Sequence, residues 1–454
     1  MASPLFALLM TCLPVAAALE RAIPRRQAGR LGCIVGYSLL LGMVGVSVVM
    51  RAFDLLDIPF TLWGVGIVWS ATGLLSLLIP RCNAFAASNA RTDTLGKMIV
   101  AICITLIALR LYTLGLEAIL RPTYAWDSKQ HWGMLARVFY EFAELQTYVA
   151  RDQWLNGDGT DYTNLHPSYP ITVPLVQTWF AMALGSWDES LVGFPWVLCY
   201  VALGCLFYGQ ARMAGAGPAL STAGTYMLLS LPYLNIQVAL PGYADLFLAT
   251  SLLGAAGAFY NWAHDRRVWQ AVLAAGSLLT CLGIKHEGFF WLLCFVPGLL
   301  MVLLGWRVSL PLLGGLLVGL VLFLFWLPED LIIAGHSLQG MQLGMRPEGW
   351  TPVYRSALVH DNWHLAIYLL CVAAFGLLIR REGKPALLGL GTALLCAIGL
   401  YLMLFVGTDR VSGAIRYTAL NRVALQLTPA LGLFTLLAFY QLARPLTPAL
   451  SAEK

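Results

Sequence analysis

Apolar residues run along this chain in long stretches that short polar segments separate. A helix that crosses a bilayer needs about 20 mainly apolar residues, or somewhat fewer where neighbouring helices cover it. The stretches that meet this condition are residues 5–19, 31–50, 58–79, 98–120, 191–208, 219–231, 246–262, 269–284, 289–304, 310–327, 365–379, 386–406 and 423–442. The pattern predicts an all-α polytopic membrane protein with about thirteen transmembrane helices.

The longest interruption of this pattern is residues 121–170, and it is rich in acids and histidines. These residues are Asp127, His131, Glu141, Glu144, Asp152, Asp158, Asp161 and His166. Where so apolar a chain gathers carboxylates in one loop, ligand binding or catalysis is the first expectation.

Two segments in and after this loop have their own apolar pattern. Apolar residues recur at helical spacing at Trp132, Leu135, Val138, Phe139, Phe142, Leu145 and Val149, and charged residues take the other positions. This predicts an amphipathic helix that either lies in the membrane interface or packs as an ordinary loop helix. Residues 171–184 are apolar but short and follow Pro170, so they predict a juxtamembrane or re-entrant helix.

The basic residues predict which side of the membrane each loop faces. With thirteen spans, one side holds Arg21, Arg25, Arg26, Arg30, Arg81, Arg91, Lys97, Arg212, Arg266, Arg267, Arg307, Arg380, Arg381, Lys384, Arg444 and Lys454. Short loops rich in Lys and Arg stay in the cytoplasm, so this side is predicted to be cytoplasmic. The amino terminus and residues 121–170 then lie outside. Because no basic region precedes it, the first apolar stretch is interpreted as a retained span and not as a cleaved signal.

Composition narrows the class further. The chain is 59% hydrophobic and 11% charged, with a mean hydropathy of +0.74, whereas soluble chains carry about a quarter charged residues. The net charge of +5 is explained by the cytoplasmic loops, and no clustered basic face suggests a nucleic-acid partner. The ten cysteines have neither zinc-site nor disulfide spacing and are interpreted as small buried hydrophobes.

The predicted topology brings four separate polar pieces to the outer surface. They are Trp126-Asp127, Tyr243-Ala244-Asp245, Lys285-His286-Glu287 and the loop with Asp409, Arg410, Arg416, Tyr417 and Arg422. Each has an ordinary structural interpretation. Asp245 can cap its helix, Lys285 and Glu287 can form a local ion pair, and the arginines can extend to lipid headgroups. The meeting of all four pieces on one face favours a site.

The chemistry of these groups suggests a bound phosphate. Guanidinium groups match phosphate oxygens with paired hydrogen bonds, and Asp127 is available to accept a proton from an incoming hydroxyl or amine. A phosphate at the bilayer edge, with apolar spans beneath it, implies a lipid tail. The combination predicts a polyprenyl-phosphate sugar donor.

At these residues the chain resembles the GT-C membrane glycosyltransferases, in the branch related to dolichyl-phosphate-mannose protein mannosyltransferases. The likeness rests on Trp126-Asp127-Ser128 before an amphipathic helix, His166-Pro167-Ser168-Tyr169-Pro170, Gly242-Tyr243-Ala244-Asp245, Lys285-His286-Glu287-Gly288 and, more weakly, the stretch 422–429. The resemblance implies a single GT-C transmembrane domain over residues 1–454. Four spans (1–120) would precede an extracytoplasmic catalytic loop (121–188), followed by the remaining spans (189–443) and a cytoplasmic tail (444–454).

The resemblance also assigns roles to residues. Asp127 would be the catalytic base of an inverting transfer. Substrate would contact Trp126, His166, Tyr169, Tyr243, Asp245, Lys285, His286 and Glu287, and the donor phosphate would contact Arg410, Arg416, Tyr417 and Arg422. Many relatives carry a second acid in this loop, but here Ser128 and Lys129 follow Asp127, so no metal or other cofactor is indicated.

The expected partners follow from this chemistry. They are a polyprenyl-phosphate sugar donor, membrane lipids and an extracytoplasmic acceptor, which is a glycan, a lipid-linked glycan or an exported protein. The expected location is a bacterial inner membrane, with the site facing the periplasm or the outside. Two alternatives stay open, namely a transporter or flippase for a lipid-linked sugar and a polysaccharide polymerase or ligase that uses a pyrophosphate-linked glycan.

Overall fold

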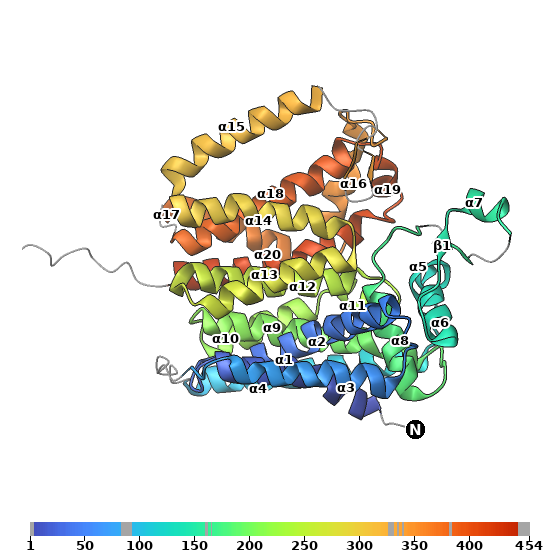
Figure 1. Ribbon diagram of the computed structural model, residues 1–454. Coiled ribbons are helices and arrows are strands. Elements are labelled where there is room, and N and C mark those ends of the chain that lie inside the picture. Colours follow the sequence, from blue (N-terminus) through green and yellow to red (C-terminus); the bar gives the residue numbers. More distant parts are fainter. Residues whose placement is uncertain are drawn as a thin grey trace, which may run out of the picture.

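The computed structural model describes residues 4–82, 93–158, 162–164, 166–325, 331–333, 336–337, 340–380 and 384–443. Asp161, Arg91, Arg381 and the tail 444–454 lie outside these ranges. The protein is a bundle of long helices that run side by side (Figure 1). Eight described helices are long and apolar enough to cross a membrane, so the protein is a helical polytopic membrane protein.

These eight helices coincide with predicted spans. They are α1 (Pro4–Ala22), α2 (Arg30–Leu55), α4 (Thr94–Leu120), α9 (Phe194–Met213, with η2, Leu191–Gly193), α12 (Asp245–Asp265), α14 (Glu287–Leu304), α18 (Pro385–Val406) and α20 (Leu420–Leu442). The other predicted spans fall on helices outside these eight. These are α3 (Leu62–Thr72, with η1, Gly73–Leu78), α10 (Pro218–Leu229), α13 (Val268–Ile284), α15 (Trp306–Phe325) and α17 (Ala366–Arg380).

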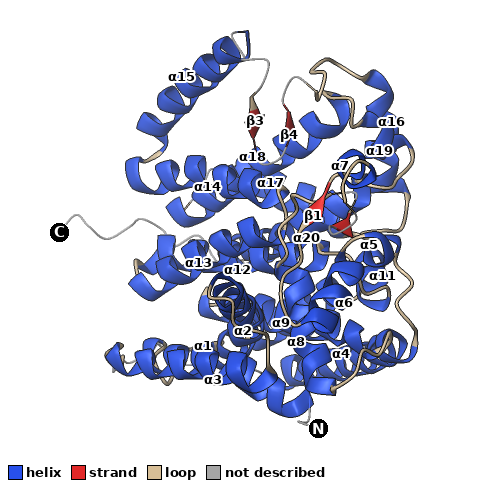
Figure 2. Cartoon of the chain, turned by 45° about the vertical axis from the view of Figure 1, so that its right-hand side comes forward, coloured by secondary structure: helices blue, strands red, loops and turns tan. Residues whose placement is uncertain are grey.

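Short elements join the long helices, and the strands among them are only two residues long (Figure 2). They are α5 (Trp126–Gln130), α6 (Trp132–Phe142), β1 (Tyr148–Val149), α7 (Arg151–Leu155), β2 (Tyr162–Thr163), α8 (Thr172–Leu184), α11 (Pro232–Ala239), β3 (Ile332–Ile333), β4 (His336–Ser337), η3 (Pro347–Gly349), α16 (Trp350–Tyr354), η4 (Arg355–Val359) and α19 (Val411–Ile415). In Figure 1, α5, α6, α7, α16 and α19 lie at the same end of the bundle.

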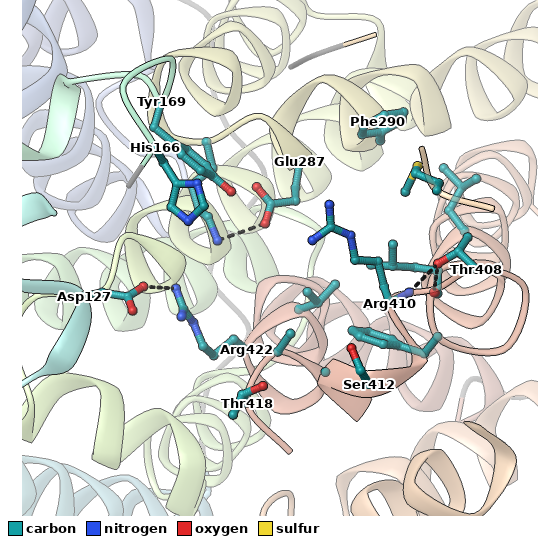
Figure 3. A pocket seen from close by; sticks show the side chains of 18 of the residues that line it. Asp127, His166, Tyr169, Glu287, Phe290, Thr408, Arg410, Ser412, Thr418 and Arg422 are labelled. Carbon is teal, nitrogen blue, oxygen red and sulfur yellow. Dashed lines mark hydrogen bonds and ion pairs between the residues drawn. The ribbon is translucent and has the colours of Figure 1, made fainter. Parts of the chain in front are cut away.

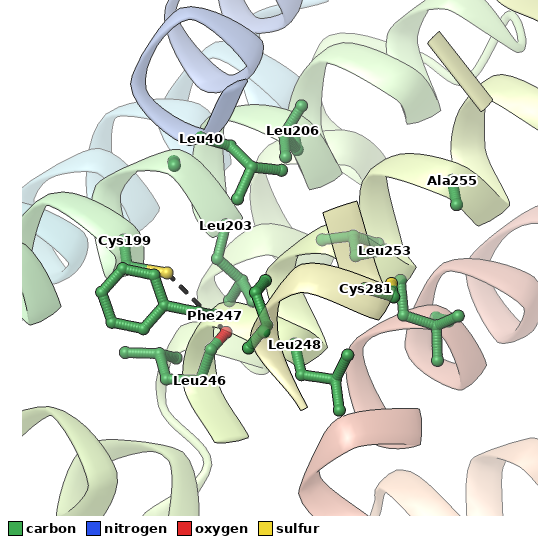
Figure 4. Close-up of a cluster of buried hydrophobic side chains, with 14 of the residues drawn as sticks. Leu40, Cys199, Leu203, Leu206, Leu246, Phe247, Leu248, Leu253, Ala255 and Cys281 are labelled. Carbon is green, nitrogen blue, oxygen red and sulfur yellow. Dashed lines mark hydrogen bonds between the residues drawn. The ribbon is translucent and has the colours of Figure 1, made fainter. Parts of the chain in front are cut away.

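Helix α12 forms the centre of the bundle and packs against α9, α13 and α20. Its side chains are almost all buried, and Figure 4 shows Leu246, Phe247 and Leu253 among the leucines of neighbouring helices. All ten cysteines are free thiols. Cys199 and Cys281 belong to this core, which agrees with their interpretation as small buried hydrophobes, whereas Cys371 is exposed and does not fit it.

A chain of hydrogen bonds ties α2, α9 and α12 together inside the core. The hydroxyl of Tyr37 donates to the carbonyl of Gly254 (2.7 Å) and accepts from the Gln210 amide (2.7 Å). Asn261 Nδ2 in turn donates to Gln210 Oε1 (2.7 Å). Because lipid offers no hydrogen-bond partners, such interhelical bonds fix how the helices are rotated against one another.

Helices α2 and α9 approach each other closely through small residues. A Cβ atom added at Gly32 would stand 2.8 Å from the carbonyl oxygen of Cys205, and one added at Gly209 would stand 2.6 Å from the backbone nitrogen of Cys33. Small residues at such positions let helix backbones pack directly in a membrane protein.

The basic connections gather at one end of the bundle, as predicted. Arg267 Nη1 donates to Gln27 Oε1 (2.8 Å), and Gly29 lies against the side chain of Arg212. The opposite end of α2 meets the loop that follows α6, where Leu145 N–H donates to Asp54 Oδ1 (2.9 Å). Helix α2, at 26 residues, therefore separates the basic end from the end that carries residues 121–170 by about 40 Å.

The predicted amphipathic helix is correct for Trp132–Phe142 and wrong beyond it. Ala143 adopts a left-handed conformation (φ 57°) and ends α6, and residues 148–149 pair in parallel with residues 162–163. Bonds to the α2–α3 connection redirect the chain here, since Phe60 N–H donates to the carbonyl of Ala143 (2.6 Å).

Most of the apolar face of α6 packs on protein. Trp132, Leu135 and Phe139 are buried, and α6 contacts α8 along its length. Thr178 Oγ1 of α8 donates to the carbonyl of Ala136 (3.0 Å). These contacts favour the packed loop helix of the two alternatives. Helix α8 is itself almost fully buried, against α1, α2 and α6.

We expect Gly209→Ala to destabilise the protein, because the new methyl group would push the α2 backbone away. Overpacking of a tight contact costs about 1–3 kcal/mol, which a lower midpoint of thermal unfolding in detergent will report. Gly115→Ala is the matched control, since a Cβ at this position in α4 meets nothing within 4 Å. Equal midpoints for the two variants would contradict the close α2–α9 packing.

Candidate active site

The four polar pieces singled out in the sequence meet in one chain of ion pairs. Arg422 Nη2 lies 2.7 Å from Asp127 Oδ2, and Arg422 Nε lies 2.8 Å from Asp245 Oδ2. Lys285 Nζ lies 2.9 Å from Asp245 Oδ1 and 3.0 Å from Glu287 Oε1. Five residues from α5, α12, α14, α20 and the turn between α13 and α14 are thereby joined at one end of the bundle (Figure 3).

Asp245 is the centre of this chain and is completely buried. Besides the two cations, it accepts a hydrogen bond at Oδ1 from Gln426 Nε2 (2.6 Å), and Trp291 Nε1 fixes the Gln426 oxygen (2.8 Å). No side chain caps the amino terminus of α12, so the helix-cap interpretation of Asp245 is wrong. Its carboxylate instead stands in the first turn, where the helix dipole favours a negative charge.

Lys285 is charged in spite of its burial. Burial by itself would lower the pKa of Lys285, but the carboxylates of Asp245 and Glu287 outweigh it and raise that pKa above its usual range. The local ion pair expected between Lys285 and Glu287 is present, and it is part of a larger network. Three carboxylates and two cations give the ion-pair chain a net charge of −1.

A cavity of about 520 Å³ opens beside the ion pairs. Its polar part is lined by Asp127, His166, Tyr169, Glu287, Arg410 and Arg422, and Figure 3 shows Arg410 extending toward Glu287. Its apolar part is lined by Phe290, Trp291, Met341, Leu343, Leu400, Met403, Leu404 and Phe405. The wall of the cavity thus combines charged and polar side chains with a group of apolar ones.

Two of the four predicted donor-phosphate residues line this cavity. Arg410 and Arg422 line it, but Arg422 is already bound to two carboxylates. Arg416 is exposed at the far end of α19 and does not line the cavity. Tyr417 does not line it either, and its ring lies 5.0 Å from that of His360.

Some of the predicted substrate-binding residues line the cavity, and others lie behind those that do. Trp126, His166 and Tyr169 line the cavity, as do Lys285 and Glu287. Glu287 Oε2 is buried and has no hydrogen-bond partner in the described structure.

Tyr243 and His286 stand behind these wall residues. The ring of Tyr243 lies under the guanidinium of Arg422 (4.6 Å), and the ring of His286 lies 4.7 Å from that of Tyr169. They can orient wall residues without contacting a ligand themselves.

His131 is a wall residue that the motifs did not single out. Asn164 Oδ1 accepts from the His166 backbone N–H (2.9 Å) and also bonds His131 Nδ1 (2.7 Å). An acceptor oxygen requires the proton on Nδ1, so Nε2 carries the lone pair. Burial lowers the pKa of His131 to about 4, although the Asn164 bond acts in the opposite direction. The ring is therefore neutral at physiological pH. The sequence signals for His131 were its place among the acids and histidines of residues 121–170 and its closeness to Asp127.

The carboxylates of the site face cations of the protein itself. Within the described ranges, no group of three or more His, Cys, Asp and Glu side chains is arranged to hold a metal ion. Asp127 and Asp245 share Arg422, and Asp245 and Glu287 share Lys285. Such an arrangement can bind polar groups, neutralise an anion and accept a proton.

Comparison with known proteins adds no relative. No protein-family model, curated protein or solved structure matches this chain. The likeness to GT-C glycosyltransferases therefore rests on the short motifs, and the geometry of the cavity carries the functional inference.

We expect Lys285→Met to lower the free energy of unfolding by about 3–5 kcal/mol, because it removes a cation from the buried carboxylate of Asp245 and from the partly buried one of Glu287. Chemical or thermal unfolding in detergent measures this loss. The control is Arg121→Met, which breaks a half-exposed pair with Glu117 and is expected to cost at most about 1 kcal/mol. A loss for Lys285→Met as small as that of the control would mean that Asp245 does not depend on this cation.

Proposed function

We propose that the protein is an inverting glycosyltransferase of the GT-C type. It moves a sugar from a polyprenyl-phosphate donor to an acceptor outside the cytoplasm. The observation that carries this proposal is the cavity itself, whose wall combines Asp127 and two arginines with a group of apolar side chains. A ligand that fits such a wall has an anionic, polar head on a long apolar tail.

The apolar wall supports a prenyl tail as part of the donor. Phe290 of α14 and Leu400 and Met403 of α18 line it. A methionine among aliphatic side chains adapts its shape to a flexible chain. The phosphate would then lie within reach of Arg410 and Arg422, which can each bind it through two N–H groups.

Arg422 links donor binding to the activity of the base. Its guanidinium now pairs with the carboxylate of Asp127 (2.7 Å). A donor phosphate competes for the same guanidinium. Its binding would weaken the Asp127–Arg422 pair and leave the carboxylate free to act on the acceptor.

The transfer of the sugar would take place within the cavity. The acceptor hydroxyl loses its proton to Asp127 as its oxygen bonds to the anomeric carbon. The bond from that carbon to the phosphate oxygen breaks, and its electron pair leaves with the polyprenyl phosphate. Arg410 and Arg422 stabilise the additional negative charge. Attack from the side opposite the phosphate inverts the anomeric centre.

Several wall residues suit contacts to the sugar and the acceptor. Glu287 Oε2, which has no partner in the described structure, can accept a hydrogen bond from a sugar hydroxyl. His166 and Tyr169 lie beside it on the wall. Trp126 is 66% exposed at the cavity edge, which suits stacking against an acceptor sugar.

The same proposal includes the architecture and the location. The chain would form one GT-C domain with about thirteen spans in a bacterial inner membrane, and the basic end of the bundle would face the cytoplasm. The position of the site at one end of the bundle supports a transferase over a transporter, because transporters bind their substrates near the bilayer midplane.

We expect Asp127→Asn to fold, to bind the donor and to transfer the sugar about 100- to 10,000-fold more slowly, which is the usual contribution of a general base. The assay measures transfer from a polyprenyl-phosphate hexose, and donor binding separately, with the purified protein. Asp152→Asn is the control, since Asp152 is exposed on α7 in the same loop. Turnover of Asp127→Asn within a few-fold of wild type would exclude Asp127 as the base.

We expect Arg410→Gln to weaken donor binding about tenfold or more, because a hydrogen bond to a charged group contributes about 1.5–3 kcal/mol. Arg416→Gln removes the same charge from the other end of α19, away from the cavity. Its donor affinity should stay within about twofold of wild type. Equal losses in the two variants would point to general attraction of the anion and not to a contact in the cavity.

A further inference from the structure

A second pocket lies at the end of the bundle opposite Asp127, where α1 ends and the segment after η1 passes by. It has a volume of about 300 Å³ and is lined by Glu20, Arg21, Arg25, Arg81 and Cys82. Glu20 is bound to Arg30, at the first residue of α2 (2.6 Å). The other end of α2 meets the loop of the candidate active site, so the two pockets are separated by the length of that helix.

The pocket is strongly positive. The charge of Glu20 is balanced by Arg30, which leaves Arg21, Arg25 and Arg81 on the wall. Three guanidinium groups around one small pocket favour an anion, and phosphate oxygens match their N–H geometry best.

Arg21 is held in place by the protein. Its Nε donates to the carbonyl of Ile79 (2.7 Å), and its Nη2 donates to the carbonyl of Leu77 (3.2 Å). The backbone N–H of Cys82 donates to the carbonyl of Arg21 (2.9 Å). These bonds fix one guanidinium of the pocket before any ligand arrives and leave further N–H groups of Arg21 for a ligand.

An exposed apolar strip leads away from the pocket. Leu74, Leu75, Leu77 and Leu78 of η1 are all more than 60% exposed, and Arg81 comes three residues after Leu78. A basic pocket beside exposed leucines in a membrane protein matches a phosphate headgroup joined to acyl chains. A soluble anion would use the pocket but not the leucines.

We propose that this pocket binds the headgroup phosphate of an anionic phospholipid, with its acyl chains along η1. The net positive charge selects an anionic lipid over a zwitterionic one. The bound lipid would join the end of α1 to the end of η1, since Arg21 and Arg81 come from these two segments. This site is independent of the proposed transferase activity.

The test compares lipid binding to the full chain by native mass spectrometry, after delipidation. The probes are phosphatidylglycerol and phosphatidylcholine with identical acyl chains. The wild type is expected to retain phosphatidylglycerol preferentially. In Arg25→Gln/Arg81→Gln this preference should fall roughly 30-fold, as expected for the loss of two basic residues near an anionic lipid. Arg21 is left unchanged because it also binds backbone carbonyls.

The control is Lys97→Gln/Arg307→Gln, which removes two exposed basic residues outside the pocket. It should keep the wild-type preference, and both double variants should unfold at similar temperatures in phosphatidylcholine. Equal retention of the two lipids by the wild type would overturn the proposal without any variant. Displacement of the lipid by millimolar inorganic phosphate would show that the pocket binds anions in general and not a lipid. An unchanged lipid preference in Arg25→Gln/Arg81→Gln would show that the lipid binds elsewhere.

Discussion

The burial of Asp245 is the constraint on which the rest of the site depends. A fully buried carboxylate is tolerated only with close cations and hydrogen bonds, and here Arg422, Lys285 and Gln426 supply them. These partners come from α20 and from the turn before α14. The requirement to neutralise one charge therefore holds three parts of the bundle in register, and it leaves Asp127 and Glu287 at the two ends of the ion-pair chain.

Each of the two cations in this arrangement pairs with two carboxylates. Arg422 is shared by a structural carboxylate and by the proposed base, and Lys285 is shared by Asp245 and Glu287. Any anion that enters the cavity competes with Asp127 for Arg422. Arg410 is exposed, and its ion pair with the exposed Asp409 is long, at 4.0 Å. It can therefore meet an anion without first leaving a buried partner. The cavity thus contains one cation that carboxylates of the protein hold, Arg422, and one that is more available to a ligand, Arg410.

The two ends of the molecule also differ in their charged residues. One end holds the carboxylates and the cavity, and the other holds the arginine pocket beside η1. Between them the core is apolar except for bonds such as those of Tyr37 and Gln210, which are satisfied within the protein. Most charged groups lie at the ends because hydrocarbon solvates them poorly, although Arg110 lies within α4. This is why the two pockets lie about a helix length apart.

The sequence by itself determined the helical membrane class and the positions of the long helices, because burial in lipid requires apolar stretches of a minimum length. It also determined that the motifs around Asp127, Asp245, Lys285 and Arg422 would meet, since each stands at a helix end predicted to lie on the same side. Only the tertiary structure decided that α6 ends at Ala143, that Gln426 and Asn164 support the site, and that Arg410 rather than Arg416 reaches the cavity. Local patterns report how polar each position is, but they do not fix how a helix is rotated or where a short loop helix such as α19 docks. Those choices depend on contacts between residues far apart in the chain, such as the bond from Tyr37 to Gly254.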